Sequence, residues 1–98
     1  MTFMQVIEYE TTQAARMDAL MDEWLKATEG KRTAFHSSLG KDRDKPSHFM
    51  QMVEFPSYEQ AMRNSDLPET RHIAEEMQIA CLDAPRFVNL DIVRDEQI

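Results

Sequence analysis

The sequence predicts one α+β domain with the element order β-α-β-β-α-β. Three observations support this prediction. The chain has 98 residues, which is the length of one domain. Residues 17–28 carry an apolar stripe with helical spacing. Residues 48–55 form an apolar run with the length and composition of a strand, so we expect a single domain over residues 1–98.

Composition narrows the classes of function. Hydrophobic residues make up 42% of the chain and charged residues 30%, which is ordinary for a folded domain. The net charge of −7 repels nucleic-acid phosphates, so no nucleic-acid partner is expected. No apolar run approaches the roughly 18 residues of a membrane span, and the first residues lack the basic start of a signal peptide. The single cysteine, Cys81, fits a reducing compartment, and these features predict a cytoplasmic protein without membrane contact.

The first half of the chain reads as a strand, a helix and a second strand. Residues 3–9 are rich in β-branched and aromatic side chains, which predicts a strand. Thr11 and Thr12 offer N-caps for a helix that Gly30 ends. Residues 33–39 form a weaker second strand. The helix has one apolar stripe, made of Met17, Leu20, Met21, Trp24, Leu25 and Thr28.

The third strand, residues 48–55, is apolar on both of its faces. Phe49, Val53 and Phe55 alternate onto one face. Met50 and Met52 fall on the other face. A strand that is apolar on both sides needs both sides covered.

The last part of the chain predicts a broken helix and a final strand. Ser57 and Gln60 form a capping box for a short helix that runs to about residue 64. Pro68 suits the first turn of a second helical piece, which we expect over residues 68–81. Residues 87–93 then alternate as a strand.

These elements predict a four-stranded antiparallel sheet with both helical segments on one face. The other face keeps apolar side chains from the third strand, such as Met50 and Met52. A bare apolar sheet face is a liability on so small a protein. We therefore expect a second copy of the chain to cover it, giving a homodimer.

Three stretches of the chain carry a resemblance to a known family: residues 3–7 (FMQVI), residues 52–61 (MVEFPSYEQA) and residues 65–72 (SDLPETRH). They resemble the antibiotic-biosynthesis-monooxygenase-like domains of the dimeric α/β-barrel superfamily. The middle stretch resembles the family pattern of a strand that ends in an aromatic residue, followed by Ser and Glu-Ala at a helix start. The resemblance covers nearly the whole chain.

The resemblance implies a ferredoxin-like fold, a dimeric α/β barrel and a pocket between sheet and helices. Relatives include cofactor-independent monooxygenases of aromatic polyketides and haem-degrading enzymes. It therefore implies a cofactor-independent monooxygenase or binding protein for a small apolar or aromatic ligand. The alternative is a non-catalytic dimeric barrel that serves as a binding or stress-related module, and the sequence leaves open whether the chain is an enzyme.

The haem-degrading branch can be tested residue by residue. The resemblance implies an asparagine on the first strand, a tryptophan ending the third strand and a histidine iron ligand on the second helical segment. His72 matches the ligand position, but Ile7 and Phe55 stand at the other two positions. Isoleucine cannot hydrogen-bond to bound oxygen, and phenylalanine lacks the indole N–H. Haem binding through His72 is the less favoured alternative, and no cofactor is expected.

Candidate site residues follow from chemistry and position. His72 and Tyr9 are the catalytic candidates, as a general acid or base or as a hydrogen-bond donor. His72 also has Glu69, Glu75 and Glu76 within one helical turn, which fits a solvated surface histidine equally well. The substrate-binding candidates would give an apolar cavity an aromatic face and a few orienting groups; they are Trp24, Gln5, Phe55 and Asn89.

A metal site is not expected. His36 and His48 lie on neighbouring strands, and with Cys81 or a carboxylate they supply ligand types. No pair of ligands has the close spacing that identifies zinc sites. The alternative interpretation places both histidines on a sheet surface or an interface.

Overall fold

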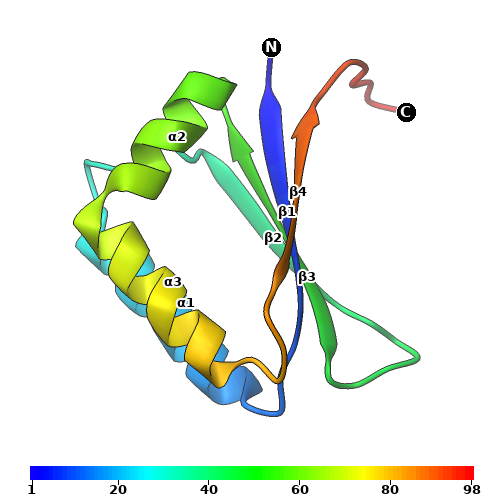
Figure 1. The fold of residues 1–98 in the computed structure, drawn as a ribbon. Coiled ribbons are helices and arrows are strands. Elements are labelled where there is room, and N and C mark those ends of the chain that lie inside the picture. The colour runs from blue at the N-terminus through cyan, green and yellow to red at the C-terminus, as the bar shows by residue number, and fades with distance from the viewer.

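The computed structural model describes residues 1–98 as one layer of strands and one layer of helices (Figure 1). The element order matches the prediction, with the second helical segment divided at Leu67 and Pro68. The elements are β1 (Phe3–Glu10), α1 (Ala14–Ala27), β2 (His36–Lys41), β3 (His48–Phe55), α2 (Tyr58–Asp66), α3 (Pro68–Ala80) and β4 (Arg86–Asp91).

The four strands form one antiparallel sheet in the order β2-β3-β1-β4. All three helices lie on the same side of this sheet (Figure 1). The predicted α+β ferredoxin-like fold is thereby confirmed. None of the helices combines the length and the apolar character needed to cross a bilayer.

Strand register assigns the two sheet faces. Phe3 lies opposite Phe55, and Tyr9 lies opposite Phe49. These residues pack with helix residues in the core, so their face is the helix face. Side chains one residue along the strands point the other way. This open face carries Met4, Val6, Met50, Met52, Val88 and Leu90, which confirms the predicted division of β3.

The buried core consists of three separate clusters. Phe3, Val53, Phe55 and Ala61 join the sheet to α2. A second cluster, with Tyr9 and Phe49 from the sheet, joins it to Met17 of α1 and Ala80 of α3. The third lies between α1 and α3 and holds Leu20, Trp24 and Ile73. No cluster of fully buried residues joins the middle of α1 and α3 to the sheet, and this is where the cavity described below lies.

Helix α1 begins differently from the prediction. Its N-cap is Gln13, and no side chain caps the helix, although Thr11 and Thr12 were the predicted caps. Thr11 accepts a hydrogen bond from the Gln13 amide at 2.9 Å and donates one to the Ala80 carbonyl at 2.7 Å. Thr11 therefore ties the start of α1 to the end of α3. Leu25 is also 40% exposed, although the predicted stripe included it.

Helices α2 and α3 begin as predicted. Ser57 accepts a hydrogen bond from the Gln60 amide at 3.2 Å, and Pro68 occupies the first turn of α3. The second strand was misplaced, because β2 begins at His36 rather than at Thr33. Thr33 is bonded to α2 instead, donating from its hydroxyl to the Gln60 carbonyl at 2.6 Å. Strand β4 likewise covers residues 86–91 rather than 87–93.

Candidate functional site

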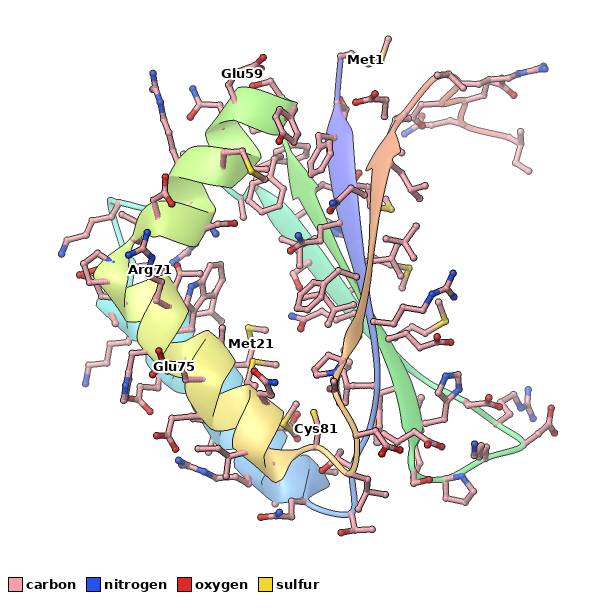
Figure 2. All side chains as sticks on the ribbon, in the orientation of Figure 1. Met1, Met21, Glu59, Arg71, Glu75 and Cys81 are labelled. Atoms are coloured by element: carbon pink, nitrogen blue, oxygen red, sulfur yellow. The ribbon has the colours of Figure 1, made fainter.

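A cavity of about 220 Å³ lies between the helix face of the sheet and the three helices. Figure 2 shows Met21 extending from α1 toward the sheet on this side of the molecule. Most of the side chains that line the cavity are apolar. The lining residues are Gln5, Ile7, Met21, Trp24, Gln51, Val53, Phe55, Asn64, Ser65, Thr70, Arg71, Ile73, Ala74, Met77 and Phe87.

Trp24 forms a rigid part of the helix wall. Its indole N–H donates a hydrogen bond to the Thr70 hydroxyl at 2.9 Å, which joins α1 to α3. The Arg32 guanidinium lies 5.7 Å from the ring centroid, within the range of a cation–π contact. The side chain is buried at 8% exposure, and it is the only tryptophan of the chain. Trp24 therefore offers a flat aromatic surface held in place from two sides.

Two glutamine side chains bring polar groups to the sheet wall. Gln51 is only 4% exposed, and its amide nitrogen donates to the Ser37 hydroxyl at 3.3 Å. The structure gives its carbonyl oxygen no protein partner, which leaves that acceptor for a ligand. Gln5 donates from its amide nitrogen to the Asn89 carbonyl oxygen at 3.2 Å. The sheet wall therefore presents fixed amide groups among apolar side chains, as small-molecule sites commonly do.

The end of the cavity near the α2–α3 junction is polar. Ser65, Thr70 and Arg71 line it, and Arg71 is the only lining residue with a charge. The guanidinium contacts Asp66 at 3.2 Å, and both side chains are mostly exposed. Exposed ion pairs of this kind contribute little to stability, so a ligand anion can replace Asp66 as the partner of Arg71 at small cost.

The chemistry of this lining is that of a binding site. It contains no Asp, Glu, His, Cys, Lys or Tyr. A general acid or base needs a side chain that exchanges a proton near neutral pH, and arginine does not. The walls can bind, orient and exclude water, while a proton would have to leave the ligand by another route.

Comparison with known proteins finds similarity in three dimensions only. No known family model and no curated protein sequence matches the chain. SnoaB, a cofactor-independent oxygenase from Streptomyces nogalater, superposes with a TM-score of 0.81 at 9% identity over 96% of this chain and 95% of that one. An antibiotic biosynthesis monooxygenase gives 0.75 at 16% identity, covering 96% and 100%. The chain shares the fold of these two proteins. Rv0793 from Mycobacterium tuberculosis shares it, with a TM-score of 0.80 at 11% identity over 99% and 100% of the two chains.

The substrate-binding candidates gather at the cavity. Trp24, Gln5 and Phe55 line it, and Asn89 is hydrogen-bonded to Gln5. The catalytic candidates His72 and Tyr9 do not line it. The roles assigned to all six residues stay predictions.

His72 is exposed on α3, next to the inward-facing Ile73. Two of the three carboxylates expected to surround it have other partners. Glu69 pairs with Lys31 at 3.1 Å, and Glu76 pairs with Arg16 at 3.3 Å. His72 forms no hydrogen bond or ion pair, in keeping with a solvated histidine.

Tyr9 lies in the second core cluster, stacked on Phe49 with ring centroids 5.6 Å apart. Burial, helped by the nearby Cys81 and Asp18, raises the pKa of the Tyr9 hydroxyl to about 12. The hydroxyl is therefore protonated at neutral pH. In this state Tyr9 is a hydrogen-bond donor rather than a base.

The sequence analysis missed two residues of the cavity. Gln51 stands on β3 between Phe49 and Val53, so strand alternation alone places it on the helix face. A glutamine on an otherwise apolar face was the available signal. Thr70, the partner of Trp24, carries no such signal, because its role depends on how α1 packs against α3.

A second cluster of polar side chains lies on the open sheet face. Both nitrogens of His48 contact carboxylates, Nδ1 at 2.8 Å from Asp42 and Nε2 at 2.9 Å from Glu8. Lys45 contacts Glu10 at 2.6 Å beside it. His36 lies at the opposite end of the hairpin, paired with Glu54. No group of three or more His, Cys, Asp or Glu side chains is arranged to hold a metal ion.

The His48 cluster predicts a pH-dependent contribution to stability. Asp42 and then Glu8 raise the pKa of His48 above its usual 6.5. Such a group stabilises the fold fully below its unfolded pKa, and the effect is lost as the pH rises through the folded value. The bond to His48 is also the main cause that lowers the pKa of Asp42 from 3.8, so the contribution of that carboxylate is lost as the pH falls. The cluster therefore contributes most to stability at pH values between 3.8 and 6.5, the usual pKa values of the Asp42 and His48 side chains.

Urea unfolding of the protein and of His48→Gln tests this expectation. The free energy of unfolding lost on substitution should be larger at about pH 5.5 than at about pH 8.5. Equal losses at the two pH values would contradict a charged His48 in the folded state.

Proposed function

We propose that this protein binds a small, largely apolar aromatic molecule in the cavity between the sheet and the helices. The observation that carries the proposal is an unfilled cavity of about 220 Å³ with a fixed aromatic wall and a polar end. A module that serves assembly alone would be expected to fill this space with its own side chains. The open cavity supports a ligand instead.

The lining suggests how the ligand lies. Its aromatic body would stack on Trp24 and contact Phe55 and Ile73, where burial of apolar surface supplies the affinity. A hydroxyl or anionic group would meet Thr70 or Arg71 at the polar end. The ligand class is therefore an aromatic compound with one acidic or hydroxyl group.

Titration with 4-phenylphenol tests binding, and Trp24 emission provides the signal. We expect a saturable change in emission, because the only tryptophan lines the cavity. Ala74→Phe, which places a phenyl ring in the lining, should weaken binding by about tenfold or more. Glu75→Phe introduces the same ring at the next position of α3, outside the cavity lining, and should bind within about twofold of the unaltered protein. No saturable change, or equal effects of the two variants, would refute the cavity as the site.

We infer further that two copies pair through the open sheet face. Val6 stands in register with Met52 on β3 and with Val88 on β4, so the apolar side chains form a continuous band. Charged pairs lie at the ends of this band, with His36–Glu54 at one end and Glu8–His48 at the other. An apolar centre with a polar rim is the usual make-up of a protein interface. The resulting homodimer would leave the cavity on the outer, helix-covered side of each sheet.

Cofactor-independent oxygenation is a second candidate function. The likeness in fold to SnoaB favours it, and so does Arg71, which would stabilise a phenolate. A phenol whose pKa is lowered by Arg71 would release its proton to solvent water, and the phenolate would then supply its own electrons to oxygen, so the lining needs no base. Oxygen consumption with an anthrone-type phenol tests this candidate. Turnover that Arg71→Gln abolishes would support it, and binding without turnover would leave the chain as a non-catalytic binding protein.

A further inference from the structure

A second cavity, of about 250 Å³, lies on the β2 side of the sheet–helix interface. Leu39 of β2 and Leu25 of α1 line it, and both are partly exposed although apolar. Its polar groups are the Tyr9 and Ser37 hydroxyls, the Gln51 amide and the Asp18 carboxylate. The second cavity therefore resembles the first in its mostly apolar walls and hydroxyl groups, and differs from it by one carboxylate.

The two cavities share three lining residues. Met21, Gln51 and Met77 border both, so their side chains form the wall that divides the space. Gln51 connects the two chemically as well. Its amide nitrogen contacts Ser37 of the second cavity at 3.3 Å and the Met21 sulfur at 3.8 Å.

The dividing wall is made largely of methionine. Met21 extends toward the sheet from α1 (Figure 2), and its one hydrogen-bonding contact is the long one to Gln51. Met77 faces it from α3 and is likewise only partly buried. Methionine has three rotatable side-chain bonds and no branch, so it changes shape at low cost. Rotation of these two thioethers would open one cavity into the other.

The size of the space points the same way. Sites for drug-sized ligands usually measure roughly 300–1,000 Å³. The first cavity, at about 220 Å³, and the second, at about 250 Å³, each fall below this range. The combined volume of the two cavities falls within this range.

We propose that the two cavities are halves of one binding site for an elongated, largely apolar ligand, and that Met21 and Met77 form a movable partition between them. This inference rests on the proposed function and extends it by naming the shape of the ligand. The ligand would lie along the helix face of the sheet and pass over Gln51, with one end beside Trp24 and the other beside Leu39. The Tyr9 hydroxyl would then reach the ligand as a hydrogen-bond donor from the second half.

Calorimetric titration with two probes of equal chemistry and different length tests the partition. The probes are 4-phenylphenol, with two rings, and 4-hydroxy-p-terphenyl, with three. Leu39→Lys places a charge in the second cavity and should weaken the longer probe at least about tenfold more than the shorter one. Met21→Ala removes half of the partition and should shift the preference toward the longer probe. Ile79→Lys makes a matched surface change at a residue that is 76% exposed, and it should leave both affinities unchanged.

The outcomes separate this inference from the function on which it rests. If neither probe binds, both are wrong. If the shorter probe binds but Leu39→Lys weakens the two probes equally or not at all, the first cavity is the whole site and only the partition is wrong. Leu39 is 47% exposed, so its substitution should leave the fold intact, and this variant stays informative even if Met21→Ala unfolds.

Discussion

Met52→Lys should convert a dimer into a monomer. Met52 lies at the centre of the open sheet face, opposite Val6 on β1 and Ser38 on β2. In a twofold interface the substitution occurs twice, once in each copy. Each lysine ammonium group would lose its hydrating water on dimerisation without gaining a charged partner. We expect the dissociation constant to rise by about 100-fold or more, since this corresponds to only about 2.7 kcal/mol. Size-exclusion chromatography with light scattering measures the change.

Ile79→Lys is the control for the added charge. Ile79 is 76% exposed on α3, on the helix layer, and its substitution should leave the dimer intact. A clean monomer of the unaltered protein at micromolar concentration would refute pairing through the open face. So would a Met52→Lys variant that dimerises as tightly as the parent chain.

Leu20→Ala should cause the largest loss of stability from a single truncation. Leu20 is completely buried between α1 and α3, where it packs with Trp24 and Ile73. Removing a buried leucine side chain costs transfer free energy and leaves a cavity, so the loss should be about 2–5 kcal/mol. Urea unfolding followed by circular dichroism, with all samples at one protein concentration, measures the loss.

Leu25→Ala is the matched comparison on the same helix. Leu25 is 40% exposed, so the same truncation should cost less than about 1 kcal/mol. Equal losses at Leu20 and Leu25 would mean that α1 is rotated relative to the packing described above.

Local patterns predicted the elements that depend on local chemistry. Strand β3 was predicted with its observed bounds, because Pro56 ends it and apolar side chains occupy most of its positions. Pro68 correctly marked the first turn of α3. The start of β2 could not be predicted, because Thr33 is tied to α2 by bonds to residues 27 and 31 positions away. Contacts of that range leave no trace in a local pattern.

Only part of the candidate site was predictable from the sequence. Helix spacing placed Trp24 on the apolar stripe of α1. The imperfect alternation of β1 left open which sheet face carries Gln5, and the register with β3 puts it on the helix face. The hydrogen bond between Trp24 and Thr70 depends on the packing of two helices that are distant in sequence. The same packing turns His72 outward while Ile73 faces the cavity, and sequence alone could not settle that rotation.

Methyl NMR of the methionine side chains tests the central claim most directly. Met21 and Met77 line the cavity, whereas Met4, Met50 and Met52 lie on the opposite sheet face. Addition of 4-phenylphenol should move the methyl resonances of Met21 and Met77 and leave those of the open face in place. Shifts confined to Met4, Met50 and Met52, or no shift at saturating ligand, would contradict a binding site between the sheet and the helices.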